Sequence, residues 1–152
     1  MSPVFKKLNL KDQREILVLN PPASFEPELK TLAGIKIHRD IKQVRVIYFS
    51  LAFVMTQHEV DTITREISRK AEGDAVVWFA YPKGSSKRYH CGINRDTGWA
   101  ALGKAGFEGV RMVAIDEDWS AVRFRRAEFI KTMTRDRRWA MSKAGKKKTA
   151  KK

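Results

Sequence analysis

Short runs of consecutive apolar residues alternate along the chain with segments in which apolar residues recur at helical spacing. Three such runs, rich in strand-forming residues, occupy 15–20, 44–54 and 75–80. Runs of this length are typical of strands buried on both faces of a sheet. The run 44–54 is the most apolar of the three and is too short to cross a bilayer. The pattern predicts three buried strands, with 44–54 at the centre of the sheet.

The segments between and after these runs favour helices. Residues 24–32 place apolar side chains on one face behind a candidate N-cap, Ser24, and Pro27 is tolerated there only in the first turn. Residues 56–70 combine apolar positions at helical spacing with charges elsewhere, which predicts an amphipathic helix. A further helix is expected over 93–105.

The remaining segments predict an edge strand, a hairpin and a terminal helix. Residues 35–38 alternate like an edge strand, and the runs 109–115 and 119–125 are joined by three acidic residues at hairpin spacing. Residues 127–141 have the composition of a basic helix.

Strands that alternate with helices predict an α/β fold with a mainly parallel, right-handed wound sheet. The predicted fold is a single three-layer Rossmann-like domain over residues 1–128, closed by a C-terminal antiparallel hairpin. A basic helix at 129–141 and a disordered Lys-rich tail at 142–152 complete the expected organisation. The strand–helix order resembles the later half of a methyltransferase sheet, a likeness of fold that does not by itself give function.

Length and composition agree with one folded domain. The chain has 152 residues, of which 43% are hydrophobic, and it contains a single cysteine. This is enough apolar material for one core, and one cysteine cannot build a disulfide framework. No apolar run approaches the ~20 residues of a membrane span, and the N-terminus lacks the apolar segment of a signal peptide. We therefore expect a cytoplasmic protein without membrane contact.

The formal net charge of +14 is concentrated at the C-terminus. Residues 143–152 contribute +6 through six lysines and 131–142 contribute +3, which leaves +5 for residues 1–130. Such a tail binds polyanions such as nucleic acid through counterion release, without sequence preference. The alternative is that it only raises solubility, and the sequence leaves both open.

Arginines and an aromatic residue precede the tail. Arg123, Arg125 and Arg126 lead into the basic helix, which holds Trp139. Arginines with an aromatic residue suit phosphate contact and base stacking, but alternating arginines on an outer strand are also typical of a solvated face. The candidate nucleic-acid contacts in this arm are Arg135, Arg137, Arg138, Lys146, Lys147 and Lys148.

Three loops are expected to meet where ligands bind in wound sheets, beyond the carboxyl ends of the parallel strands. These loops are 20–24, 81–88 and 116–119. The basic and hydroxyl side chains of the loop 81–88 suit a phosphate or a carboxylate. The alternative is a structural turn whose lysines pair with Asp116 and Asp118. The candidate ligand-binding residues at this edge are Lys83, Ser85, Ser86, Lys87, Asp116, Asp118 and Trp119.

The usual phosphate-binding loops are absent. The first strand ends in Asn20, Pro21 and Pro22 rather than Gly-x-Gly-x-x-Gly, and no Gly-x-x-x-x-Gly-Lys-Ser/Thr occurs. Two prolines remove backbone donors that a dinucleotide pyrophosphate or a methyltransferase cofactor needs there. The sequence therefore argues against an ordinary nucleotide or S-adenosylmethionine enzyme, and we expect no cofactor.

No catalytic or metal site is predicted. Cys91 lies next to His90, but neighbouring residues of an extended chain point to opposite sides. His38, His58 and His90 lack metal-ligand spacing, and no carboxylate completes a zinc or iron set.

Three segments carry a resemblance. Residues 78–87, 93–96 and 113–125, with the Pro-Lys loop and the Asp-Trp-Ser hairpin, resemble an uncharacterised bacterial family of small proteins (a domain of unknown function, the DUF3052 type). The resemblance implies a bacterial, cytoplasmic Rossmann-like domain. It carries no established activity, transfers no catalytic residue and does not cover 129–152.

Three functional hypotheses follow. The first is a non-enzymatic binding or regulatory domain that holds a small anion or a protein partner at the carboxyl edge of the sheet. The second is a nucleic-acid-associated protein that acts through residues 123–152. The third is an enzyme of unrecognised type at the same edge, using Asp116, Asp118, Lys83 or Cys91. The sequence leaves the oligomeric state open.

Overall fold

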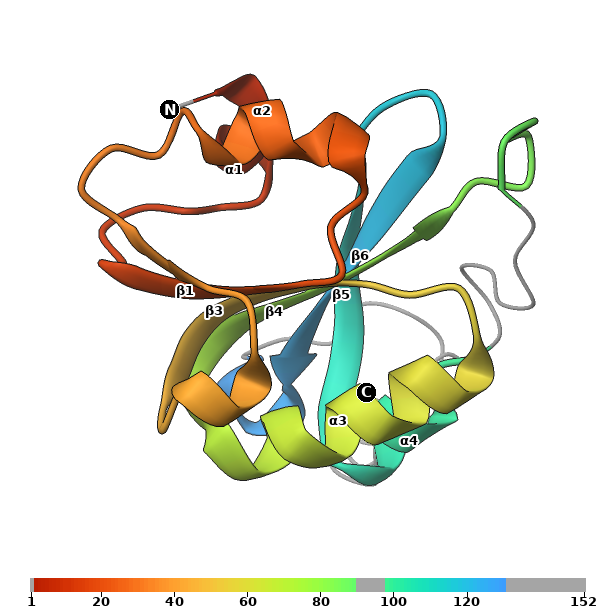
Figure 1. Cartoon of the computed structure of the whole chain (residues 1–152). Coiled ribbons are helices and arrows are strands. Elements are labelled where there is room, and N and C mark those ends of the chain that lie inside the picture. The colour runs from red at the N-terminus through yellow and green to blue at the C-terminus, as the bar shows by residue number, and fades with distance from the viewer. Residues whose placement is uncertain (1, 90–97, 131–152) are drawn as a thin grey trace.

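The computed structural model of the chain describes residues 2–89 and 98–130. Its helices and strands, in chain order, are α1 (Pro3–Lys7), β1 (Glu15–Leu19), α2 (Glu26–Leu29), β2 (Lys36–His38), β3 (Ile47–Phe53), α3 (Gln57–Lys70), β4 (Ala71–Pro82), α4 (Ala100–Lys104), β5 (Phe107–Ala114) and β6 (Trp119–Arg126). Figure 1 shows these elements around one twisted sheet.

The sheet has six strands in the order β2-β1-β3-β4-β6-β5. Strands β1 to β4 pair in parallel, whereas β6 is antiparallel to both β4 and β5. Because β5 and β4 are each antiparallel to β6, β5 runs in the same direction as β1 to β4. The prediction of a mainly parallel Rossmann-like sheet with an antiparallel C-terminal hairpin is confirmed.

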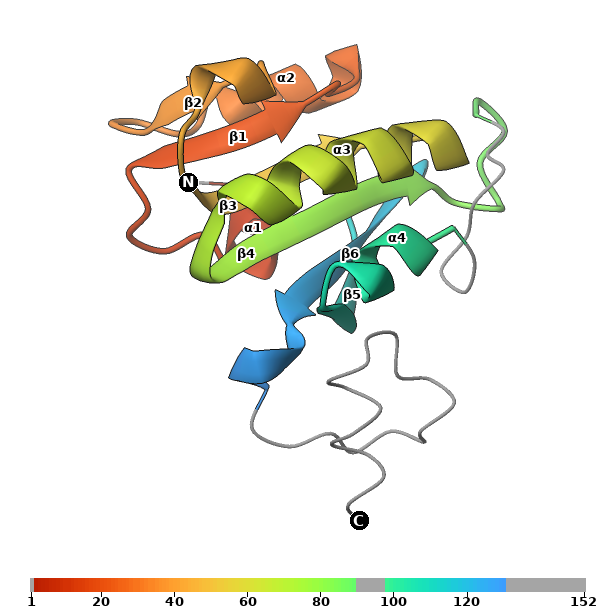
Figure 2. The same ribbon diagram turned by 90° about the horizontal axis from the view of Figure 1, so that it is seen from below.

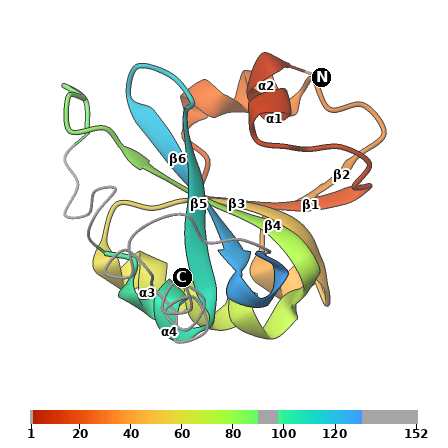
Figure 3. The same cartoon turned by 180° about the vertical axis from the view of Figure 1, so that it is seen from behind.

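Helices cover both faces of the sheet, which gives three layers. Figures 1 and 3 show α1 and α2 on one side and α3 and α4 on the other, and Figure 2 shows α3 and α4 from the side that they cover. One buried cluster joins the sheet to α3 and α4 through Val60, Ile67 and Leu102. The other joins it to α1 and α2 through Phe5 and Leu29.

The longest helix begins where its sequence predicts. The side chain of Thr56 accepts a hydrogen bond from the backbone N–H of Glu59, and the Glu59 carboxylate accepts one in return from the backbone N–H of Thr56. This capping box satisfies donors that the first helical turn leaves free. Val60 and Ile67 face the core, so the predicted amphipathic helix at 56–70 is confirmed as α3.

The predicted helix at 24–32 is shorter in the structure. A 3₁₀ turn (Ala23–Phe25) leads into α2, with Pro27 in its first turn. Ser24 lies inside that turn and caps nothing, so its predicted role as N-cap is wrong. Phe25 and Leu29 are buried as predicted.

Two further segments differ from expectation or lie outside the described chain. Helix α1 was not predicted, and of the predicted helix 93–105 only 98–105 is described, with α4 beginning at Ala100. Where the predicted basic helix was to begin, residues 127–129 form a 3₁₀ turn and Ile130 is extended. Residues 131–152, with the candidate nucleic-acid residues, lie outside the described residues, as do His90 and Cys91. Within the described residues, no helix is long and apolar enough to cross a membrane.

Candidate functional site

The carboxyl edge of the sheet brings two of the predicted loops into direct contact. The backbone N–H of Lys83 donates to the carbonyl of Asp118 at 2.8 Å. The hydroxyl of Ser86 donates to Oδ1 of the same aspartate at 2.9 Å. The loop after β4 and the turn between β5 and β6 therefore form one structure, although more than 30 residues separate Ser86 from Asp118 in the sequence.

Ser86 organises the loop after β4. Its buried hydroxyl accepts hydrogen bonds from the backbone N–H groups of Arg88 and Tyr89, at 3.2 and 3.1 Å. Its own N–H donates to the carbonyl of Lys83. Ser86 is thus occupied inside the loop, whereas Ser85 and Lys87 are exposed and Lys83 is half-buried.

Asp116 organises the turn between β5 and β6. Its Oδ1 accepts hydrogen bonds from the backbone N–H groups of Asp118 and Trp119, at 2.8 and 2.9 Å. This arrangement is an Asx turn, which fixes the chain direction at the hairpin. Neither Lys83 nor Lys87 forms an ion pair with these two aspartates, so the alternative of a turn held by lysine–aspartate pairs does not describe this edge.

A row of aromatic rings lies under the carboxyl edge. Trp119 is 3% exposed and packs between Tyr89 and Phe53, with ring centroids 5.1 Å away in both cases. Phe53 continues the row to Phe25 at 5.0 Å, and Phe25 continues it to Phe5 at 5.7 Å. The predicted site residue Trp119 is therefore a packing residue whose ring is held from both sides.

The same row passes the point at which wound sheets usually bind ligands. That point lies between β1 and β3, where the connections leave the sheet in opposite directions. Phe25 and Phe53, each 2% exposed, pack together beside the carboxyl end of β3. The chain leaving β1 passes through Asn20, whose φ is 55°, into Pro21 and Pro22, which have no N–H to offer a ligand.

An exposed ion pair ties β2 to α2. Both terminal nitrogens of Arg39 donate to the carboxylate of Glu26, at 2.8 and 2.7 Å. The hydrogen bonds from Arg39 hold the pKa of Glu26 below its ordinary value, and the same pair raises the pKa of Arg39. This ion pair adds a surface interaction next to Phe25.

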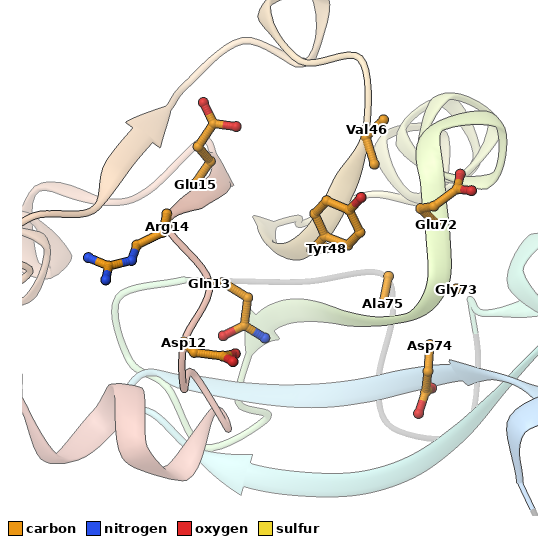
Figure 4. A pocket seen from close by; sticks show the side chains of 10 residues that line it. All are labelled: Asp12, Gln13, Arg14, Glu15, Val46, Tyr48, Glu72, Gly73, Asp74 and Ala75. Carbon is orange, nitrogen blue, oxygen red and sulfur yellow. The ribbon is translucent and has the colours of Figure 1, made fainter.

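A hollow of about 550 Å³ lies at the opposite, amino edge of the sheet. Figure 4 shows Tyr48 from β3 facing it, with Glu72 and Asp74 at the start of β4 and the guanidinium of Arg14 turned away from Tyr48. Tyr48 is 56% exposed, although it stands in the most apolar run of the sequence. Within the described residues no group of three or more His, Cys, Asp or Glu side chains could hold a metal ion. The lining residues are Asp12, Gln13, Arg14, Glu15, Val46, Tyr48, Glu72, Gly73, Asp74 and Ala75.

Sequence patterns gave no direct signal for this hollow, because its walls come from three strand ends and a preceding loop. The indirect indications in the sequence were a tyrosine inside an apolar run and a glycine between two acidic residues, Glu72 and Asp74. In the structure this glycine, Gly73, has a φ of 56°.

The arginines of β6 do not form the expected outer stripe. Strand β6 is second from the edge of the sheet, and Arg126 points to the α3 side. There its Nη2 donates to the carbonyls of Ser68 and Ala71, and its guanidinium lies 4.7 Å from the ring of Phe107. Alternation along the strand places Arg125 on the other face.

Comparison with known proteins identifies the fold. No family model matches the chain, and no curated protein matches it by sequence. Several solved structures are similar in fold, among them the following two. A SAM-dependent methyltransferase from Aquifex aeolicus gives a TM-score of 0.58 at 15% identity, over 81% of this chain and 87% of that one. The N-methyltransferase NodS from Bradyrhizobium japonicum WM9 gives 0.51 at 13% identity, over 80% and 91%. The chain therefore has a methyltransferase-like Rossmann fold.

Proposed function

We propose that this protein is a non-enzymatic binding domain built on a methyltransferase-like fold. In the proposal, its ligand is a small anion held by the loops 83–88 and 116–119 at the carboxyl edge. The observation that carries the proposal is the packing of Phe25 on Phe53 beside the switch point of the sheet, where the chain also has two prolines.

The residues of the switch point do not fit S-adenosylmethionine, the cofactor named for the Aquifex protein. A cofactor that carries a nucleoside needs an open crevice there, with backbone N–H groups or a helix N-terminus directed at it. Pro21 and Pro22 lack those N–H groups, and the Phe25 and Phe53 rings lie buried against each other where the described residues meet this point. We therefore propose no methyl-transfer chemistry for this chain.

Among the described residues, no carboxylate forms an ion pair with the cations of the loop after β4. Lys83, Lys87 and Arg88 belong to a loop whose shape is fixed by Ser86. The carboxylate of the nearby Asp118 accepts a hydrogen bond from the hydroxyl of Ser86 rather than from a lysine ammonium group. Positive side chains on a fixed loop suit a phosphate or carboxylate ligand. An acidic segment of a protein partner presents the same carboxylates.

The test measures thermal unfolding with a panel of small phosphates and carboxylates at constant ionic strength. A ligand that binds the folded state raises the unfolding temperature, and above its Kd the rise grows with the logarithm of its concentration. The double variant Lys83→Gln and Lys87→Gln should lose the shift, whereas Lys104→Gln, on the exposed surface of α4, should keep it. No shift at saturating ligand in the wild-type chain would refute a small anion, and binding of an acidic peptide alone would assign the edge to a protein partner.

Two finer predictions stay open to experiment. Deleting residues 142–152 should abolish salt-sensitive nucleic-acid binding if the tail acts in that way. Membership of the uncharacterised bacterial family stays a prediction from residues 75–125.

A further inference from the structure

Arg123 is a charged residue inside the sheet that forms no ion pair with any other described residue. It stands in the middle of β6, paired with Trp78 of β4 on one side and Arg111 of β5 on the other. Its side chain is half-buried, and its Nε is fully buried without a hydrogen-bond partner. Buried polar atoms of native proteins almost always have a partner, and of the described buried side-chain atoms without one, only Nε of Arg123 belongs to a charged group.

Burial and neighbouring arginines both disfavour the charge on Arg123. Burial lowers the pKa of Arg123 most, Arg125 and Arg111 lower it further, and Asp74 raises it. Asp74 is already engaged by Arg125, whose Nε and Nη2 donate to it at 2.7 to 3.0 Å. Like charges directly opposite each other on neighbouring strands destabilise a sheet. Arg111 and Arg123 stand in that relation.

Arg126 shows that an arginine on this strand can be satisfied by the protein alone. Its Nη2 binds two backbone carbonyls at the end of α3, and its guanidinium lies over Phe107. Three residues earlier, Arg123 has no comparable partner among the described residues. The difference lies in the surroundings of the two side chains, because residue type and strand are the same.

We infer that Arg111 and Arg123 form a binding site for a phosphate group on the face of the β5–β6 hairpin that carries Arg125. Two guanidinium groups on neighbouring strands, whose Cα atoms lie about 5 Å apart, can each direct a fork of N–H donors at one tetrahedral anion. The Asp74–Arg125 ion pair would bound the site on the side toward the end of β6. The phosphate group can belong to a free phosphate or nucleotide, or to a nucleic-acid backbone.

This site is separate from the carboxyl edge. Arg123 lies four positions beyond Trp119 along β6, which corresponds to about 13 Å of strand. The variants Lys83→Gln and Lys87→Gln should leave the hairpin site intact, so each proposal can fail without the other.

The test follows the Nε–H resonance of Arg123 by NMR, and the unfolding temperature, as inorganic phosphate replaces chloride at constant ionic strength. Phosphate should shift that resonance and stabilise the fold. Arg123→Met and Arg111→Gln should each weaken phosphate binding about tenfold or more. The control Arg65→Gln removes the same charge from the exposed surface of α3 and should bind as the wild type does.

The Arg123→Met variant should weaken phosphate binding but increase the stability of the protein in chloride. In chloride it should unfold at a higher temperature than the wild type, because it removes a half-buried charge that lacks a partner. A variant that merely damaged the fold would unfold at a lower temperature. Arg111→Gln, at an exposed position, tests the site without changing the interior.

Two further titrations identify the source of the phosphate group. A nucleoside monophosphate that binds more tightly than inorganic phosphate would assign the site to a free ligand. A single-stranded oligonucleotide whose affinity falls in Arg111→Gln but not in Arg65→Gln would assign it to nucleic acid. The proposal is overturned if none of these probes shifts the Arg123 resonance, or if Arg65→Gln weakens binding as much as Arg111→Gln.

Discussion

The two halves of the carboxyl edge are built in different ways from strands that run in the same direction. Over β1 and β3, the edge is closed by aromatic rings and by two prolines, with Phe25 against Phe53. Over β4 and β5, it is formed by short polar side chains, with Ser86 bonded to Asp118 and Asp116 bonded to the backbone. The half over β1 and β3 is packed like a protein core. In the half over β4 and β5, hydrogen bonds fix the loops that carry the cationic side chains.

This difference shows that the fold determines where the carboxyl edge lies but not which ligand that edge binds. The solved methyltransferases of similar fold share the sheet arrangement with this chain at 15% and 13% identity. Function lies in local residues grafted on the fold. Here the local residues close the half of the edge at which a wound sheet normally binds its ligand, and they leave the other half polar.

The largest effect is expected in the closed half. Phe25→Ala should lower the free energy of unfolding by about 3–5 kcal/mol, because it removes a buried ring that contacts Phe5 and Phe53. Denaturant unfolding measures this loss. The matched change at an exposed site, Ser85→Ala, should stay within about 0.5 kcal/mol of the wild type. A loss below about 1 kcal/mol for Phe25→Ala would show that this crevice is not packed as described.

A smaller effect is expected in the polar half. Ser86→Ala removes the hydroxyl that Asp118, Arg88 and Tyr89 share, and it should cost about 1–3 kcal/mol of stability. It should also weaken anion binding, because the loop that presents Lys83 loses its internal support. Ser85→Ala serves again as the control. Equal anion affinity in both variants would contradict the role given to Ser86.

Two substitutions at Asp116 should separate the contribution of its charge to stability from the contribution of the turn that it forms. Asp116→Ala removes the acceptor for two backbone N–H groups and should cost about 1 kcal/mol, whereas Asp116→Asn keeps an oxygen in the same position and should cost less. Chemical denaturation of the two variants, side by side, separates the Asx turn from the charge. Equal losses would mean that the charge, and not the turn, matters at this position.

The smallest effect concerns the ion pair beside the closed half. The pKa of Glu26 is lowered in the folded protein, so the pair stabilises the fold above the ordinary value of 4.5 and loses its effect as pH falls through the folded pKa. The difference in unfolding temperature between the wild type and Glu26→Gln should therefore be present at neutral pH and disappear at low pH. The effect is small because both side chains are solvent-accessible. A difference that grew toward low pH would have the wrong sign.

The sequence was sufficient to locate the central strands and the principal helix. Apolar runs located β1, β3 and β4, and the spacing from Thr56 onward located α3, because local propensity and burial agree there. Helix α1 was missed because five residues with one buried side chain, Phe5, give too short a periodic signal. Ser24 was misassigned because the Pro27 that follows it allows a 3₁₀ turn instead of a regular helix start.

Features that depend on long-range pairing could not be predicted. The prolines after β1 were visible in the sequence, but the packing of Phe25 on Phe53 depends on how the strands are ordered. The alternation of Arg123 and Arg125 was equally visible, yet it did not show that β6 lies inside the sheet or that Arg111 stands opposite Arg123. Contacts between strands distant in sequence decide which of these side chains is solvated.

The most direct test of the account is an amide NMR titration of the full chain, first with S-adenosylmethionine and then with small phosphates and carboxylates. The contrast between the two halves predicts no shift of residues 20–25 and 53–56 with the cofactor. It predicts saturable shifts of residues 83–89 and 116–119 with an anion. Saturable shifts of the first set with S-adenosylmethionine would show that the switch point is open and would contradict the account.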